Sequence, residues 1–542
     1  MHSKLRRLPF VFSAAVLALA LTACGSTKQP SAAPSSSGSG TVAAGPSSTF
    51  TYGTYTDVMV GWDPSTAYSN EILAMQNMYE TLTRYNAQTK QLEPLLATSW
   101  KSSKDGKTWT FTLRKGVTFH TGRPMTAASV KAAIERTMKL KQGAAYIWGS
   151  VKSIDANGST VVFHLKYAAP LDLIASADYA AYIFDAKAAP SAALPKWFTA
   201  AHDAGTGPYQ IDKYAKGQEV EVRLKADPKY WGGWSSAHYK RVVFRVVPQA
   251  TTSAQLLRAG ELSFAERLTP QLRDSFKSDS NVAVTSQTSF QNLLAMLNTK
   301  SGPLANKTVR EAVGYAIDYD GIISALHGGG TKSHGMVPPG LLGHSDSISG
   351  FQHDPAKAKQ LLAQAGYGPG KKKLSLSLTH TQGDADQSLV STLIKSNLAA
   401  VGANVTVQPL AWPTQWDKAK SSNLSRRQDI LVFYWWPDYA DPYSWFINLV
   451  HTEKQPFFNL SYYSNPQVDT MIAKAPSLTA TDRQAANDLY VNLQKKLMQD
   501  VPSIPLYDQA YQRTMLKSVG GFVENPAYPN VVFAYNLHPQ KA

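Results

Sequence analysis

The sequence predicts an α/β fold built in two or more lobes. Strand and helix patterns alternate along the whole chain, which is typical of helices packed on sheets rather than of an all-β body. About 490 residues follow the first 48, well above the roughly 250 to 300 at which a single hydrophobic core stops growing. The composition, 43% hydrophobic and 17% charged, is that of a globular chain. No tandem repeat of fixed period is present, so a solenoid is not expected.

The N-terminal residues predict export from the cytoplasm. Lys4, Arg6 and Arg7 precede an almost unbroken apolar run over residues 8–21. This run is shorter than the roughly 20 residues that a membrane-spanning helix needs. A basic start followed by an apolar stretch of this size is typical of an export signal. The general secretory route and the twin-arginine route both stay open, although the residues after Arg6 and Arg7 fit the twin-arginine pattern poorly.

The segment Leu-Thr-Ala-Cys-Gly at residues 21–25 resembles the lipobox of bacterial lipoproteins. This resemblance implies that residues 1–23 are a signal peptide and that Cys24 becomes the lipidated first residue of the mature protein. The alternative is an ordinary signal peptide that happens to contain a cysteine. Cys24 is the only cysteine of the chain, so a disulfide within the chain cannot account for it.

Residues 24–48 predict a flexible tether. Ser, Gly, Ala, Pro and Thr make up almost the whole segment after Cys24, which leaves too few apolar side chains to bury a core. No later segment of the sequence is long and apolar enough to cross a membrane. We therefore expect a folded body that begins near Phe50, lies in the extracytoplasmic (periplasmic) space, and is held at the outer face of the cell membrane by the lipid on Cys24.

The formal net charge of +16 does not indicate a nucleic-acid partner. Lysines and arginines are scattered, and the few dense clusters, such as residues 371–373 and 426–427, are short. An exported chain also has little access to nucleic acid. The charge is interpreted as attraction to an anionic cell surface or as having no specific partner.

Several strands are predicted from alternating apolar and polar residues. Trp109, Phe111 and Leu113 alternate with threonines and Arg114, which is the period-two pattern of a half-buried strand. A turn at Gly106 would join this strand to a preceding strand. Similar patterns predict strands over residues 161–165, 220–224, 241–247 and 374–378.

Helices are predicted from their end signals. Asp354 as a cap, Pro355 in the first turn and Gly366 as a stop define one short helix. Thr308 and Glu311, three residues apart, predict a capping box at the start of a helix that runs through residue 316. Further helices are predicted over residues 126–140 and 482–498.

Four phrases, in this order along about 450 residues, are similar to those of the family 5 extracytoplasmic solute-binding proteins, the peptide and nickel type that serve ABC importers. One phrase alone would be weak support, but four in the family's order are hard to obtain by chance. The phrases are residues 92–127, the Gly-Thr-Gly-Pro-Tyr segment at 205–209 followed by Tyr230-Trp231, residues 309–318, and residues 501–507.

The resemblance implies a two-lobed periplasmic-binding-protein-like fold (type II) with an extra subdomain in the first lobe. The base of the first lobe would be assembled from discontinuous pieces of chain. The ligand would bind in the cleft between the lobes, and closure around it would present a surface to an ABC permease and ATPase complex. No catalysis and no cofactor are expected, and the chain is expected to act as a monomer. The implied parts are a lobe I base at residues 49–70, 203–287 and 505–542, an extra subdomain at 71–202, and lobe II at 288–504.

Ten aromatic residues lie between residues 412 and 446. About half are expected to pack in the core. The segment 436–442, Trp-Pro-Asp-Tyr-Ala-Asp-Pro, is similar to the segment of peptide-binding members whose aspartate pairs with the ligand's α-ammonium group, and the matching residue is Asp438. A desolvated ammonium needs a charged acceptor, while Asp441 before Pro442 is typical of a turn. The predicted ligand-binding residues are Trp416, Trp435, Trp436, Asp438 and Tyr439.

The cargo itself stays open. A short peptide is the first hypothesis, and its carboxylate would need an Arg, Lys or His that the sequence does not select. The same fold could bind an oligosaccharide, because tryptophans stack on sugar rings, or nickel, a metal chelate or haem. The histidines at 327, 334, 344 and 353 are spaced too loosely for a recognisable metal site. A hydrolase is a further alternative, but no nucleophile or metalloprotease motif is present.

Overall fold

The computed structural model describes residues 48–235 and 237–541. These described residues form one compact unit. Cys24, the predicted signal peptide and the predicted tether up to residue 47 lie outside the described residues. Among the helices of the described part, none combines the length and apolarity needed to cross a membrane.

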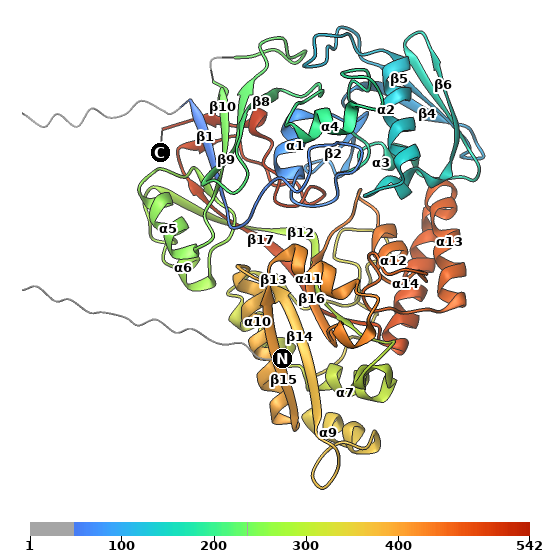
Figure 1. Ribbon diagram of the computed structural model, residues 1–542, viewed down its shortest axis with the longest axis vertical. Coiled ribbons are helices and arrows are strands. Elements are labelled where there is room, and N and C mark those ends of the chain that lie inside the picture. The colour runs from blue at the N-terminus through green and yellow to red at the C-terminus, as the bar shows by residue number, and fades with distance from the viewer. Residues whose placement is uncertain (1–47, 236, 542) are drawn as a thin grey trace, which may run out of the picture. The chain divides into compact units, whose positions relative to one another are not determined.

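An 11-stranded mixed sheet runs through the body, in the order β15-β14-β16-β12-β17-β11-β1-β10-β9-β8, with β13 (Gly330–Thr331) paired to β17. Its centre is the antiparallel pair of two long strands, β12 (Val282–Leu297) and β17 (Ser503–Leu516) (Figure 1). The β1 half of the sheet consists of β11 (Phe264–Ala265), β1 (Thr49–Thr54), β10 (Arg241–Val246), β9 (Val220–Ala226) and β8 (Tyr209–Tyr214). The β14 half consists of β16 (Ile430–Trp435), β14 (Leu374–Thr381) and β15 (Ala403–Leu410).

The β14 half is built from parallel strands and helices. β14 pairs in parallel with both β15 and β16, and its side chains Leu374, Leu376 and Leu378 are buried. Ser375 between them is exposed and Ser377 is half-buried, so this part of the strand alternates as predicted. The helices of this half include α7 (Lys307–Ala316), α8 (Tyr319–Ala325), α9 (Pro355–Gln364) and α10 (Ala385–Ala400).

A separate antiparallel sheet, β4-β5-β7-β6, lies at the upper right of Figure 1. Its strands are β4 (Ala97–Ser102), β5 (Thr108–Leu113), β6 (Val151–Asn157) and β7 (Thr160–Leu165). In β5 the odd-numbered residues from Trp109 to Leu113 are buried, as the alternation predicts, and Gly106 takes a positive φ of 65° in the turn before it. Helix α2 (Ala127–Leu140) packs against β6 and β7.

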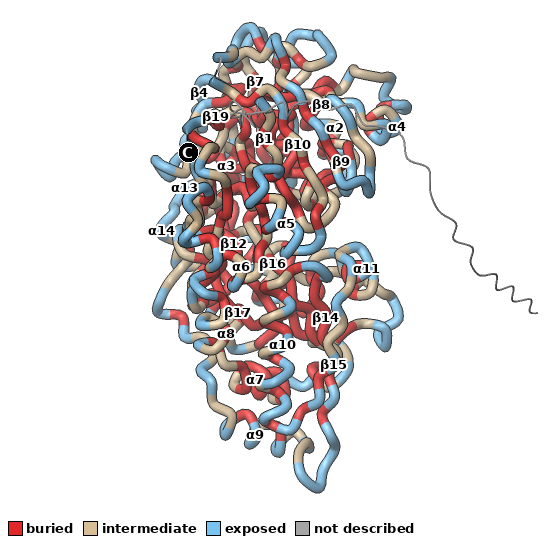
Figure 2. The backbone as a smooth tube through the Cα atoms, turned by 90° about the vertical axis from the view of Figure 1, so that its left-hand side faces the viewer, coloured by how far each residue is buried: buried red, intermediate tan, exposed pale blue. Residues whose placement is uncertain are grey.

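The predicted α/β class with an extra antiparallel subdomain is therefore confirmed. All five predicted strands exist within a few residues of their expected ends. The remaining elements are α1 (Ile72–Met78), β2 (Thr83–Asn86), β3 (Gln91–Pro94), α3 (Leu171–Ile174), α4 (Leu194–Thr199), α5 (Ala250–Arg258), α6 (Pro270–Asp274), α11 (Trp412–Ala419), α12 (Tyr443–Leu449), α13 (Pro466–Thr481), α14 (Arg483–Asp500), β18 (Val519–Gly520), β19 (His538–Pro539) and four 3₁₀ turns. Figure 2 shows that the buried residues follow the strands of the large sheet.

One predicted helix start is wrong. Thr308 and Glu311 form no capping box, because α7 begins earlier and Asn306 is its cap: the Asn306 side chain accepts a hydrogen bond of 2.9 Å from the backbone N–H of Thr308. The preceding 3₁₀ turn, Pro303–Ala305, brings the chain into the helix two residues before the expected point. The cap predicted at Asp354 and the helix starts predicted at Thr126 and Asp482 are confirmed.

Candidate functional site

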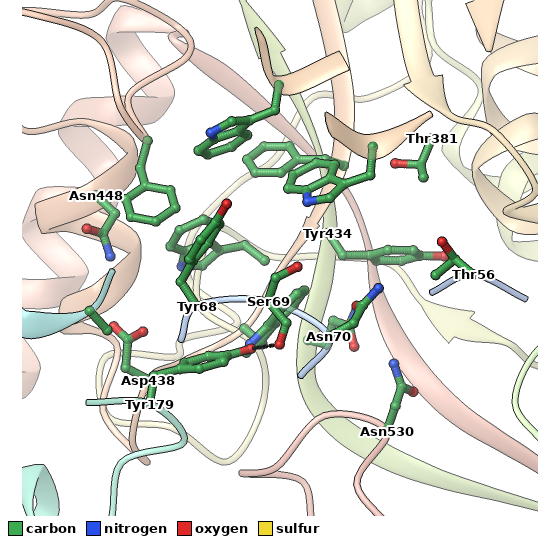
Figure 3. Close-up of a pocket in the computed structure, with 18 of the residues that line it drawn as sticks. Thr56, Tyr68, Ser69, Asn70, Tyr179, Thr381, Tyr434, Asp438, Asn448 and Asn530 are labelled. Carbon is green, nitrogen blue, oxygen red and sulfur yellow. Dashed lines mark hydrogen bonds between the residues drawn. The ribbon is translucent and has the colours of Figure 1, made fainter. Parts of the chain in front are cut away.

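A pocket lies between the β1 half and the β14 half of the large sheet. Its solvent-accessible volume is about 100 Å³. The β1 half contributes the loop after β1 and the residues after β11, and the β14 half contributes the ends of β14 and β16 and the helices that follow them (Figure 3). Segments far apart in the sequence therefore meet around one space.

Aromatic side chains form one wall of this pocket. Trp412 and Trp416 on α11 have ring centroids 5.1 Å apart, and Phe458 lies 5.3 Å from Trp416. Six of the ten aromatics between residues 412 and 446 line the pocket: Trp412, Trp416, Phe433, Tyr434, Trp435 and Trp436. The other four, Tyr439, Tyr443, Trp445 and Phe446, pack in the core.

Of the predicted ligand-binding residues, Trp416, Trp435, Trp436 and Asp438 line the pocket. Tyr439 does not line it: this side chain is 4% exposed and belongs to the hydrophobic core. Asp441 has the turn role expected for it, because its Oδ1 accepts hydrogen bonds from the Tyr443 N–H at 2.8 Å and the Tyr490 hydroxyl at 3.0 Å.

Asp438 stands at one side of the pocket as a buried carboxylate (Figure 3). It follows β16, is 9% exposed, and accepts a hydrogen bond from the Tyr146 hydroxyl. Asn448 on α12 donates to the same hydroxyl at 2.6 Å. Burial raises the pKa of Asp438 to about 7, and the hydrogen bond from Tyr146 offsets only part of this effect. A cation placed here would stabilise the ionised form.

A second buried acid, Asp178, lies next to Asp438. The backbone N–H of Asp178 donates to the carbonyl oxygen of Asp438 at 2.7 Å. Burial, and then the nearby charge of Asp438, raise the pKa of the Asp178 side chain well above its ordinary value. Within the described residues, Oδ2 of Asp178 has no hydrogen-bond partner. Asp178 itself does not line the pocket, so on this side Asp438 is the carboxyl group that a bound cation can reach.

Arg267 stands at the other side of the pocket. Its guanidinium lies 4.9 Å from the ring centre of Tyr434, which Figure 3 shows across the pocket from Asp438. The side chain is 11% exposed, and its Nε has no hydrogen-bond partner among the described residues. Asp384 and Asp386, at the start of α10, approach it only to 3.9 Å each.

Arg267 remains charged in this position. Burial alone would lower the pKa of the guanidinium, but Tyr434 and Asp384 hold it above its ordinary value. The pairs at 3.9 Å are longer than a hydrogen bond between a guanidinium and a carboxylate, which is about 2.8 Å. The donors of Arg267 are thus available to an anion in the pocket. The sequence left the anion partner open, and no local pattern marked Arg267.

The histidines that were weighed as metal ligands lie elsewhere. His327 pairs with Asp274 at 2.5 Å, and His344 contacts the carbonyl oxygen of Val337 at 2.9 Å. Neither lines the pocket. Across residues 48–235 and 237–541, no group of three His, Cys, Asp or Glu side chains is arranged to hold a metal ion.

Comparisons with known proteins agree on the family. The family model for bacterial extracellular solute-binding proteins, family 5 (middle part), matches residues 91–457. The probable D,D-dipeptide-binding periplasmic protein DdpA of Escherichia coli is 30% identical over 479 residues, which cover 86% of this chain and 90% of that protein. Heme-binding protein A of Haemophilus influenzae is 26% identical, and the match covers 96% and 97% of the two chains.

The solved structures agree on the fold. The periplasmic binding protein DppA of Helicobacter pylori, in complex with the peptide STSA, superimposes with a TM-score of 0.81 at 24% identity, over 92% of this chain and 99% of that one. Members of the matched family bind solutes for ABC transporters and catalyse no reaction. This chain belongs to family 5 of the bacterial extracellular solute-binding proteins, the peptide and nickel type.

Proposed function

We propose that this protein is the receptor of an ABC importer for short peptides and that it binds the peptide by its two charged ends. Asp438 would pair with the α-ammonium group and Arg267 with the carboxylate. The observation that carries this proposal is the pair of buried, opposite and incompletely satisfied charges at the two sides of one pocket. A free peptide has the matching charges at its ends.

The rest of the pocket suits a peptide main chain. Polar side chains between the two charges can donate to and accept from peptide groups, which are the same in every peptide. The aromatic wall excludes water and so strengthens charged hydrogen bonds. The polar residues that line the pocket, apart from the two charged ones, include Thr56, Ser69, Asn70, Gln291, Thr381, Gln387 and Asn530. A related protein named for D,D-dipeptides and a similar fold solved with a bound peptide support the same cargo.

The lobe division is part of the proposal. The boundaries between lobe I and lobe II, at residues 287/288 and 504/505, fall inside β12 and β17. These two strands run through both halves of the sheet. The register of this pair shifts between Thr288 and Asn292 and again between Leu293 and Leu294. Such irregularities weaken the ladder locally, so the two halves can move about this point.

Blocking the ends of a peptide tests the proposal directly. An N-acetylated dipeptide and a C-amidated dipeptide are each expected to bind about 100-fold more weakly than the free dipeptide, because each leaves one buried charge unpaired. Isothermal titration with the purified residues 48–542 measures all three. The proposal fails if both blocked forms bind like the free dipeptide. Native mass spectrometry of the same protein would also contradict it by revealing a bound sugar, haem or metal chelate.

The lipid anchor is the remaining part of the proposal. Cys24 would hold the protein at the outer face of the cell membrane, and residues 25–48 would let the body reach the permease. In a bacterial host, the full-length protein is expected in the detergent phase of a membrane extract, and Cys24→Ala is expected in the aqueous phase or as unprocessed precursor. An equal distribution of processed wild type and variant between the phases would refute the anchor.

A further inference from the structure

A second cavity, called the side chamber here, adjoins the ligand pocket on the Asp438 side. Its volume is about 1020 Å³, and it lies between the extra subdomain and the β14 half of the sheet. Five residues line both spaces: Tyr68, Tyr146, Trp416, Asn448 and Phe458. The chamber is therefore continuous with the pocket, and its size is beyond what two amino-acid residues need.

The boundary between the two spaces is the group of side chains that holds Asp438. The Tyr146 hydroxyl donates to Asp438 and accepts from Asn448, and both Tyr146 and Asn448 face the side chamber as well. A cation bound to Asp438 would stand at this boundary. The carbon that bears the cation can then send one substituent along the pocket and another into the chamber.

Lysines give the side chamber a positive charge. Lys141 ends α2 and Lys166 follows β7, and neither forms an ion pair within the described residues, whereas Lys420 pairs with Asp417 at 3.6 Å. His451 also lines the chamber. Lys166 donates to the Gly149 carbonyl oxygen at 3.1 Å, a contact that leaves its charge uncompensated.

The two carboxyl groups of the chamber balance this charge only in part. Burial raises the pKa of Glu71 to about 7, so this group is partly neutral at physiological pH. Glu453 accepts the backbone N–H groups of Phe457 at 2.7 Å and Asn459 at 3.1 Å, both through Oε2, and these bonds do not cancel its charge. Lys141 and Lys166 together exceed the charge of this one carboxylate and can attract an anion from the ligand.

We propose that the side chamber receives an anionic group attached to the same residue that presents the ammonium to Asp438. The preferred ligand is then a peptide whose first residue carries a second carboxylate. That carboxylate can be the side chain of an ordinary N-terminal glutamate, or the α-carboxylate of a glutamate joined through its γ-carbon. This inference rests on the proposed peptide function and adds the identity of the first residue.

Four dipeptides test it by isothermal titration at low salt: Ala-Ala, Gln-Ala, Glu-Ala and γ-Glu-Ala. Gln-Ala and Glu-Ala have the same shape and differ in charge. At least one of the two glutamate peptides is expected to bind about tenfold more tightly than Gln-Ala, the effect of two partly exposed ion pairs. The preference should shrink at about 0.5 M salt because such pairs are screened. The tighter of the two glutamate peptides identifies the source of the carboxylate.

Lysine variants supply the second half of the test. In the double variant Lys141→Gln/Lys166→Gln, the preference should fall below about twofold while the affinity for Ala-Ala stays the same. The matched control, Lys139→Gln/Lys152→Gln, alters exposed lysines of α2 and β6 that do not line the chamber and should keep the preference.

Two results would overturn the inference while leaving the peptide function intact. One is equal binding of Gln-Ala and both glutamate peptides. The other is a preference that survives in Lys141→Gln/Lys166→Gln. If Ala-Ala and all other dipeptides fail to bind, the proposed function itself is wrong and the inference falls with it.

Discussion

Asp438→Asn is expected to weaken the binding of a free dipeptide by about 100-fold, or about 2.7 kcal/mol. Asparagine keeps the shape of the side chain and can still accept the hydrogen bond from Tyr146. It removes the negative charge, so the peptide ammonium would be desolvated without a charged partner. Isothermal titration measures the loss.

The same change is expected to leave thermal unfolding nearly unchanged. Asp438 is buried, and its raised pKa indicates that the ionised form is costly in the free protein. Loss of binding without loss of stability would therefore separate a ligand contact from a structural one. Asp441→Asn is the matched control, because Asn at 441 keeps an acceptor for Tyr443 and Tyr490 and should change affinity by no more than about twofold. Unaltered dipeptide binding by Asp438→Asn would remove Asp438 from the site.

The pH dependence of binding gives an independent view of the same carboxyl. An aspartate ordinarily has a pKa near 3.9, and in the free protein the pKa of Asp438 is raised to about 7. Only the ionised form pairs with an ammonium, so affinity should be highest above pH 7 and fall as the pH drops from 7 to 5, by up to about tenfold per unit. In Asp438→Asn this slope should disappear. A flat profile in the wild type would contradict the assignment.

The fold could be predicted well from the sequence because its signals are local. Strands β5 and β14 follow from the alternation of apolar and polar residues, and caps such as Asp354 lie within three residues of the N–H groups they satisfy. The error at α7 arose because both Asn306 and Thr308 are residues that can cap a helix. The preceding 3₁₀ turn determines that Asn306 is the cap. Nothing in the pattern of residues 303–311 reveals that turn.

The site could be predicted only where a single segment builds it. Trp435, Trp436 and Asp438 lie close together in the sequence and line the pocket together, but the Tyr439 side chain packs in the core. Tyr146 meets Asp438 across 292 positions. Arg267 lies in a short loop after β11 and contacts Asp384 at the start of α10. This contact forms only when the two halves of the sheet face each other. Contacts between residues so far apart leave no periodic pattern or characteristic spacing in the sequence, so they could not be predicted from it.

Arg267→Gln is expected to weaken binding of a free dipeptide by about 100-fold, because the peptide carboxylate loses its charged partner. The C-amidated dipeptide, which lacks that carboxylate, should bind the variant and the wild type with equal affinity. This difference between the two ligands identifies the end of the peptide that Arg267 contacts. Equal losses for both ligands would instead indicate that Arg267 only supports the shape of the pocket.

Stability must be separated from binding in this variant. Without Arg267, Asp384 and Asp386 keep only Arg273, which approaches Asp386 to 4.0 Å, so unfolding is expected to become easier by about 2 kcal/mol. Adding Asp384→Asn removes one of the uncompensated charges and keeps the cap of α10, since asparagine caps helices as well as aspartate does. The double variant should therefore recover most of the stability lost by Arg267→Gln, as measured by urea unfolding, and still fail to bind a free dipeptide tightly. Recovery of binding together with stability would mean that Arg267 acts through the fold and that another cation holds the ligand's carboxylate.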